Sequence, residues 1–399
     1  MRKVLVLIFL GAIIAAFAYR SELYRLYKVM NFFEPATISY NFRNIREIFP
    51  TRMVPASSNP IEISNSRVKA RLPDSFVIND SVIITSDYLQ HTSTDALLIL
   101  HKDTIRLEWY NNGFKPSDYH ISFSMSKSVV SALVGIAIDE GFIHSIYDDV
   151  TKYLPEFKGT GYEDVMIKDV LQMSSGVKFD EDYSDFNSDI NVLGRYFALG
   201  KSMRNFALTM ERQYEPGTFN QYVSVDTQIL GMILSAATNM TVSQFMYDRL
   251  WEPLNATSDA FWIIDDEGME FVIGGLNCTA RDYARIGLLY LHEGNWRGQQ
   301  IVPKDWVTAS ITPDALHLFP GERENAKSKD GYGYQWWIPY GAEDEFNAQG
   351  IYTQFIYVDP DLDMVIVKLS SNHHFKTDTT GYYHDHEIAL YRKIADQFE

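Results

Sequence analysis

Cysteine is nearly absent from this chain, in which Cys278 is the single example. One cysteine excludes an intrachain disulfide and a metal site built from thiolates. Cys278 also lacks the second cysteine of a redox motif, so we interpret it as a small packed residue rather than a nucleophile.

Basic residues are scarce relative to acidic ones. Lys and Arg together number 35 against 52 Asp and Glu, which gives a net charge of −17. A surface that binds nucleic acid needs clustered Lys and Arg, and no such cluster occurs, so nucleic acid is not an expected partner. With 399 residues, 46% of them hydrophobic, the chain is globular and long enough to bury a large core.

Long apolar runs are also rare, and the one that stands out is Val4 to Ala18, directly after the basic start Met1-Arg2-Lys3. A run of about 15 residues is short for a membrane span and typical of a signal sequence. Ala16-Phe17-Ala18 suits a signal peptidase, whereas the bulky apolar residues that follow suit an uncleaved anchor. Residues 1–20 are therefore predicted to be a signal peptide or signal anchor; a buried N-terminal helix is the remaining alternative.

The basic N-terminus and the apolar run that follows it predict a location outside the cytoplasm. We expect an exported protein, periplasmic or otherwise extracytoplasmic, that contacts a membrane only through its N-terminal segment. An anchor in the inner membrane, formed by residues 4–18, is compatible with the same pattern. The oligomeric state is not predicted by the sequence.

The rest of the chain divides into an arm and one large domain. Residues 21–75 contain several prolines and no sustained periodicity, so we interpret them as an arm or linker, and residues 76–399 as the folded domain. Alternating apolar residues predict β-hairpins near 96–110 and 353–369, and the signals from 147 to 320 are mainly helical. The fold class is therefore α+β: an antiparallel sheet built from both ends of the chain, flanked by helices, with a large all-helical insert.

Ser124 and Lys127 are the first residues in the chain that suggest a catalytic site. A broadly apolar helix is predicted from Ser126 to about Gly141, which places Ser124 at its N-terminus, where free N–H groups favour developing negative charge. Lys127 lies one helical turn further on, and an ammonium in these apolar surroundings should have a lowered pKa. A neutral amine there could accept the serine proton, as in Ser–Lys hydrolases.

Two later segments supply partners in a fixed order, and together they resemble a known family. Tyr222-Val223-Ser224 follows a Pro-Gly turn, and Ala348-Gln349-Gly350 leads into a strand. With Ser124-x-x-Lys127, these segments resemble the serine hydrolases of the β-lactamase and penicillin-binding-protein fold, over about residues 80 to 398. The branch that it resembles holds AmpC-type β-lactamases, D-Ala-D-Ala peptidases, esterases and 6-aminohexanoate-dimer hydrolases.

The resemblance implies a site and a reaction. Ser124 would attack an amide or ester carbonyl and form an acyl-enzyme, while Lys127 and Tyr222 share the acid–base work. The backbone N–H groups of Ser124 and Ile351 would bind the oxyanion. Neither a metal nor a cofactor is implied, and which of Lys127 and Tyr222 accepts the first proton is left open.

Two departures from the family pattern narrow the substrate. Ala348 stands where β-lactamases and peptidases have a lysine that pairs with a substrate carboxylate, and Ser224 stands where many members have asparagine. With Gly350, these positions are the predicted substrate-binding residues. The departures favour a neutral or flexible amide or ester, although peptidoglycan peptidase or β-lactamase work and a non-catalytic binding or sensing role are alternatives.

Other clusters of polar or aromatic residues are more typical of structural positions than of functional sites. The histidines near the C-terminus lack a clear carboxylate partner, so a solvated loop is favoured over a metal site. A Ser-His-Asp triad is disfavoured because no Gly-x-Ser-x-Gly elbow occurs. The acidic run around Glu181 is interpreted mainly as a solvated loop that could border the cleft, and Trp336 and Trp337 as core residues.

Overall fold

A seven-stranded antiparallel sheet occupies the centre of the computed structural model, which describes residues 20–323, 328–377 and 383–399. The predicted hairpins at 96–110 and 353–369 are confirmed. The first strand of the earlier hairpin pairs with the second strand of the later one, so both ends of the chain build one sheet. The order is β11 (Gly331–Tyr332), β12 (Trp337–Ile338), β13 (Phe346–Gly350), β14 (Gln354–Asp359), β15 (Met364–Ser370), β4 (Thr94–His101) and β5 (Thr104–Tyr110).

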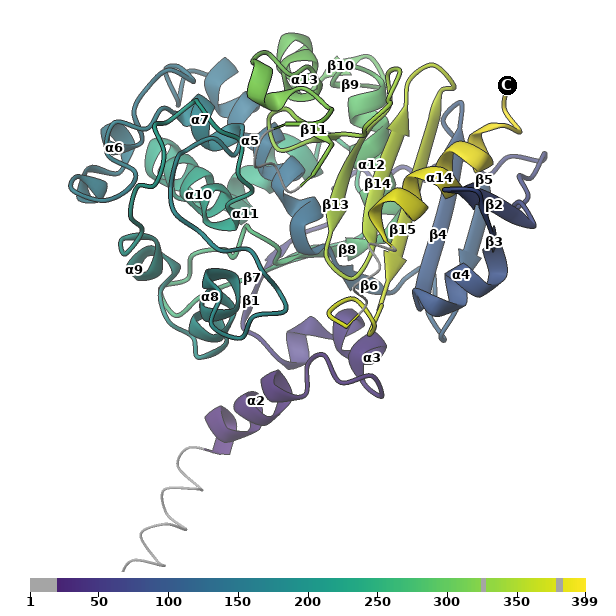
Figure 1. Cartoon of the computed structure of the whole chain (residues 1–399), viewed down its shortest axis with the longest axis horizontal. Helices are drawn as coiled ribbons and strands as arrows, with labels where there is room; N and C mark the ends of the chain where they lie inside the picture. Colours follow the sequence, from purple (N-terminus) through teal and green to yellow (C-terminus); the bar gives the residue numbers. More distant parts are fainter. Residues whose placement is uncertain (1–19, 324–327, 378–382) are drawn as a thin grey trace, which may run out of the picture.

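Helices cover both faces of this sheet, as Figure 1 shows. One face packs on α14 (His384–Ala395) and α4 (Thr85–His91), and the other packs on α12 (Ala280–Leu291) and the helical region beyond it. Every residue of β4 and β15 is buried, which explains why both strands are nearly continuous apolar runs. The α+β class predicted from the sequence is confirmed.

The middle of the chain is mainly helical, but it is not wholly so. Two strands that the sequence analysis missed, β7 (Ala260–Ile263) and β8 (Leu276–Thr279), lie inside the segment 147–320. They join β1 (Thr51–Val54) and β6 (Tyr119–Ile121) in a second sheet of order β1-β7-β8-β6. All four residues of each missed strand are buried. The β7 sequence is a continuous apolar run without alternation, and the β8 sequence alternates over only four residues.

The remaining elements are short strands and the helices of the arm and insert. Two small hairpins pair β2 (Ser75–Ile78) with β3 (Ser81–Ile84) and β9 (Asn295–Trp296) with β10 (Gln299–Gln300). The helical elements not yet given are α2 (Arg20–Met30), α3 (Ile38–Arg43), η1 (Ile45–Glu47), η2 (Phe123–Met125), α5 (Ser126–Asp139), α6 (Val150–Tyr153), η3 (Pro155–Phe157), α7 (Ile167–Leu171), α8 (Asp189–Ala198), α9 (Met203–Ala207), α10 (Ser224–Thr238), α11 (Val242–Met246), the π-helical turn η4 (Tyr247–Trp251), α13 (Lys304–Ile311) and η5 (Leu316–Leu318).

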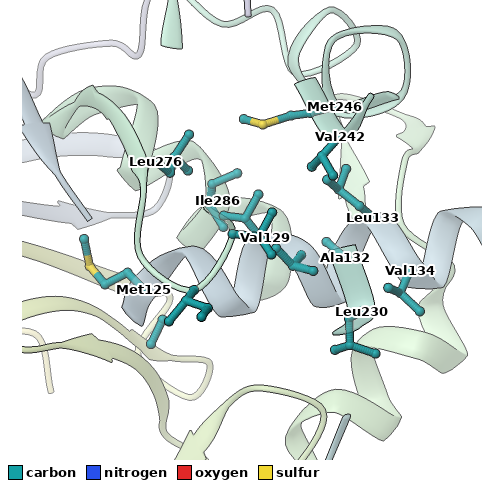
Figure 2. Packing of buried hydrophobic residues seen from close by; sticks show 14 of the residues in the cluster. Met125, Val129, Ala132, Leu133, Val134, Leu230, Val242, Met246, Leu276 and Ile286 are labelled. Carbon is teal, nitrogen blue, oxygen red and sulfur yellow. The ribbon is translucent and has the colours of Figure 1, made fainter. Parts of the chain in front are cut away.

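The helix α5 runs through the main core. Its residues from Ser126 to Ala137 are all buried, as the broad apolar pattern predicted. Figure 2 shows Val129 and Leu133 of α5 among side chains from α10, α11, α12 and β8. Packing on all sides fixes α5 in place, and therefore also the residues at its N-terminus.

The segment 21–75, which the sequence presents as an arm or linker, is extensively packed. Eight of its apolar side chains, from Phe32 to Ile63, join the main core, and β1 pairs with β7. In Figure 1, α2 projects away from the body, whereas α3 lies against it near β6.

The predicted signal peptide or anchor, residues 4–18, falls outside the described residues. Within the described ranges, no single helix has the length and apolar character to cross a membrane, although the bent pair Ser224–Thr238 and Val242–Trp251 meets the criteria when taken together.

Candidate active site

Ser124 lies where the sequence predicts it, in the short turn η2 that leads directly into α5. The preceding residue, Phe123, has φ of +44°, a left-handed conformation that non-glycine residues rarely adopt. The hydroxyl of Ser126 donates hydrogen bonds to the carbonyl oxygens of Phe123 (3.0 Å) and Val272 (2.8 Å). The turn is therefore sharply bent and is held by the loop before β8.

Lys127 is the immediate partner of Ser124. Its Nζ donates to Ser124 Oγ at 3.0 Å and to the Ile273 carbonyl oxygen at 2.8 Å, and the residue is only 1% exposed. Burial lowers the pKa of Lys127 to about 7, while the nearby Glu181 carboxylate acts in the opposite direction. An appreciable fraction of Lys127 is thus a neutral amine near neutral pH, within reach of the serine proton.

Tyr222 approaches the same pair from the loop before α10. The Lys127 Nζ lies 5.3 Å from the centre of the Tyr222 ring. Burial and then the negative charge of Glu181 raise the pKa of Tyr222, against a smaller lowering by its hydrogen bond with Ser124. The phenol is therefore protonated at neutral pH and suited to donating a proton.

The loop that carries Tyr222 is held by the segment around residue 173. The Gln221 N–H donates to the Met173 carbonyl oxygen at 2.9 Å, and the Asn220 side chain donates to the Gln172 carbonyl oxygen at 2.9 Å. Because the two residues directly before Tyr222 are fixed in this way, Tyr222 has a defined position relative to Ser124.

Gly350 brings the end of β13 against the serine turn. A Cβ atom at Gly350 would lie 2.5 Å from the Ser122 carbonyl oxygen and 3.0 Å from the Ser124 nitrogen, so only glycine permits this approach. Ile351 follows at once, which places its backbone beside that of Ser124. In the described parts of the chain, neither the Ser124 N–H nor the Ile351 N–H donates a hydrogen bond to another segment.

The other two predicted substrate-binding residues are buried. Ser224 is fully buried, and its hydroxyl donates to Glu181 Oε1 at 2.6 Å. Ala348 is 1% exposed and belongs to the main hydrophobic core. Neither position presents a polar side chain to solvent, and no cation stands at position 348.

Glu181 is a residue of the site that the sequence did not single out. The acidic run was interpreted mainly as a solvated loop, which holds for the exposed Asp182 and Asp185. Glu181 instead turns inward, accepts hydrogen bonds from Ser224 and from the Tyr183 hydroxyl (2.7 Å), and influences the pKa of Lys127. Burial raises the pKa of Glu181 itself, while Lys127 opposes that shift.

Two aromatic residues at the site were also missed. Trp337 is partly exposed and stacks on Tyr222, with ring centres 5.2 Å apart, whereas its neighbour Trp336 is a core residue as predicted. Tyr183 packs against Phe375 as well as binding Glu181. No sequence signal distinguishes either residue from ordinary core aromatics, because their roles depend on contacts between distant segments.

The histidines near the C-terminus do not form one cluster. His373 and His374 pack ring against ring at 3.9 Å, and His374 stacks on His91. His384 lies elsewhere, 2.8 Å from Asp330, and this carboxylate helps to raise the pKa of His384 to about 9 although burial acts against it. Among the described residues, no three His, Cys, Asp or Glu side chains are grouped as metal ligands.

Comparison with known proteins agrees with this geometry. A sequence model of the Beta-lactamase family matches residues 84–390, about three quarters of the chain. The chain belongs to the β-lactamase family. It is 32% identical over 343 residues to 6-aminohexanoate-dimer hydrolase of Paenarthrobacter ureafaciens, an alignment that covers 83% of this chain and 84% of the relative.

Solved structures show the same β-lactamase fold. A protein from Bacillus anthracis, proposed to be a 6-aminohexanoate-dimer hydrolase, superposes with a TM-score of 0.82 over 92% of this chain and 96% of its own, at 22% identity. A family VIII carboxylesterase superposes with a TM-score of 0.55 over 77% and 92% at 14% identity. The family resemblance predicted from Ser124, Lys127 and Tyr222 is therefore confirmed, and the chain is a β-lactamase-fold hydrolase.

Proposed function

We propose that this β-lactamase-fold protein is a serine hydrolase that cleaves an amide or ester bond through an acyl-enzyme on Ser124. The observation that carries the proposal is the 3.0 Å contact between Ser124 Oγ and Lys127 Nζ, an amine whose pKa burial lowers to about 7. An amine with that pKa is poised to act as a general base at neutral pH.

In the proposed reaction, Ser124 Oγ attacks the substrate carbonyl carbon as its proton passes to the neutral Lys127. Lys127 is the more suitable first acceptor, because the raised pKa of Tyr222 disfavours a tyrosinate. Tyr222 then donates its proton to the departing amine or alcohol and regains it through Lys127. Water hydrolyses the acyl-enzyme, with the same residues as base and acid, and releases the carboxylic acid.

The N–H groups of Ser124 and Ile351 are the proposed oxyanion donors. The close approach at Gly350 supports this role, since it sets the two backbone segments side by side. A donor of this kind contributes about 3 kcal/mol to stabilisation of the transition state. The Ser224 hydroxyl, which donates to Glu181, fixes that carboxylate.

A neutral or flexible amide or ester is the proposed substrate class. Ala348 is buried in the core and offers no cation for a substrate carboxylate, which disfavours β-lactams and peptidoglycan peptides. The relative with 32% identity over most of both chains is named as a 6-aminohexanoate-dimer hydrolase, and a dimer of that flexible unit is compatible with a flexible amide substrate.

Hydrolysis of p-nitrophenyl esters by the full chain, together with fluorophosphonate labelling, tests the proposal. We expect turnover and labelling that are both lost in Ser124→Ala. A parent protein that is folded but neither labels nor turns over any ester or linear amide would overturn it in favour of a binding role. Faster cleavage of β-lactams than of linear amides would contradict the proposed substrate class.

We also propose that the protein is exported, on the basis of the apolar run that follows its basic N-terminus. An alkaline phosphatase fused after residue 399 should be active in cells and should fractionate with membranes if the segment is an anchor. An inactive fusion with intact expression would contradict export.

A further inference from the structure

The two proposed oxyanion donors are each next to an aromatic residue in an unfavourable backbone conformation. Phe123 precedes Ser124, and Tyr352 follows Ile351; their φ angles are +44° and +63°. Non-glycine residues adopt such angles only where the surrounding structure holds them. The backbone at the oxyanion site therefore depends on contacts that fix these two side chains.

One side chain from the N-terminal arm contacts both aromatic residues. The Phe42 ring on α3 lies 5.0 Å from the Phe123 ring and 5.3 Å from the Tyr352 ring, edge to face in both cases. Phe123 and Tyr352 are in turn 5.3 Å apart, so the three rings form a closed triangle. Phe42 is fully buried, and Phe33 of the same arm stacks on Tyr352 at 5.1 Å.

Polar contacts fasten this part of the arm to the sheet. The Ser39 hydroxyl donates to Asp95 at 2.8 Å, and Asp95 is a fully buried residue of β4. The same carboxylate lies 3.3 Å from the ring of His120, which also packs against Phe42. The position of Phe42 is thus set by the central sheet rather than by the arm alone.

We propose that Phe42 is a positioning residue for the oxyanion site, acting through Phe123 and Tyr352. The inference rests on the proposed function, because the alignment of the Ser124 and Ile351 N–H groups matters only for a developing oxyanion. Removal of the ring would let both strained turns relax. A displacement of about 1 Å at such a site can cost on the order of a hundredfold in rate.

Phe42→Leu in the full-length protein tests this role, with Phe49→Leu as the matched control. Phe49 is also a buried arm residue, and its ring packs on Phe32 (5.7 Å) and Phe197 (5.8 Å). Among the described residues it has no ring contact with Phe123 or Tyr352. Both variants lose aromatic packing in the arm, but only Phe42→Leu removes a direct ring contact with Phe123 and Tyr352.

Two readouts are measured on both variants: steady-state ester hydrolysis, and hydrogen–deuterium exchange of peptides that span residues 121–126 and 350–354. We expect Phe42→Leu to reduce kcat at least tenfold with little change in KM, because an oxyanion contact acts in the transition state. Exchange should become faster in both peptides. Phe49→Leu should stay within about twofold of the parent kcat at a similar loss of thermal stability.

Equal effects of the two variants on kcat and on exchange would overturn the inference and leave Phe42 as an ordinary core residue. A parent without Ser124-dependent turnover would instead overturn the proposed function. In that case the exchange data still test whether Phe42 fixes the two turns. Faster exchange in both peptides with Phe42→Leu but not with Phe49→Leu would support this role, and unchanged exchange with Phe42→Leu would refute it.

Discussion

Replacement of Lys127 by methionine should stabilise the protein while it abolishes activity. Lys127 is buried, and its pKa is lowered from 10.5 to about 7, so the folded protein binds its proton far more weakly than the unfolded chain does. At about 1.4 kcal/mol per pKa unit, this shift corresponds to roughly 5 kcal/mol of destabilisation below pH 7. Methionine has a similar length and no charge to desolvate.

Lost hydrogen bonds reduce this gain. The Ile273 carbonyl oxygen, which accepts from Lys127 at 2.8 Å, would be left without that donor. Such a loss costs about 1–3 kcal/mol, so we expect Lys127→Met to be more stable than the parent by about 2–4 kcal/mol at pH 6.

The pH dependence gives a second, sharper test. Between pH 7 and 10.5 the unfolded chain binds a proton at Lys127 that the folded chain has released, so the stability of the parent rises with pH in this window. Lys127→Met lacks this rise. Its advantage over the parent should therefore shrink by about 3 kcal/mol between pH 6 and pH 9.

Urea unfolding of both proteins at pH 6 and pH 9 measures these differences, with ester hydrolysis followed in parallel. Ser124→Ala serves as the control, because it is also expected to be inactive but keeps the lysine and its pH dependence. A decrease in stability at pH 6, or a difference that does not change with pH, would refute the view that a desolvated amine faces Ser124. In the parallel assay, the rate of ester hydrolysis by Lys127→Met should fall at least about a hundredfold relative to the parent.

Three further predictions follow from particular contacts. Gly350→Ala should lower kcat at least about tenfold in ester hydrolysis, since its Cβ would lie 2.5 Å from the Ser122 carbonyl oxygen; an unchanged kcat would contradict the close approach. Glu181→Gln should move the acidic limb of the kcat/KM profile to lower pH, because the carboxylate raises the pKa of Lys127; a limb that stays in place or moves upward would exclude this coupling. Asp226→Asn should be more stable than the parent in urea at pH 8, with a smaller advantage at pH 4. Burial raises the pKa of Asp226 to about 8, so the parent loses stability as pH rises from 4 to 8, and equal pH profiles would argue against this burial cost.

The proposed catalytic pair was predictable from the sequence because its two residues are close in the chain. Ser124 and Lys127 lie one helical turn apart at the start of an apolar helix, so helical geometry alone places them together. The two hairpins were predictable for the same reason, since each is a pair of adjacent strands. The link from these residues to Tyr222 and Ile351 came from the resemblance to a family rather than from periodicity.

Tertiary structure decided the features that depend on contacts between distant segments. The strand β7 is a fully buried apolar run without alternation, so periodicity does not distinguish it from a buried helix segment, and β8 alternates over only four residues. Glu181 belongs to an acidic run whose neighbours are exposed, and only its contact with Ser224 shows that it turns inward.

The aromatic contacts of the arm depend most clearly on tertiary structure. Phe42 precedes Phe123 by 81 positions and Tyr352 by 310, yet the three rings are in mutual contact. The sequence by itself determined that a serine and a lysine meet at the start of an apolar helix, because the two residues lie one helical turn apart. What surrounds that turn, and therefore the charge and geometry at the reacting atoms, was decided by packing, since burial is a property of the folded chain as a whole.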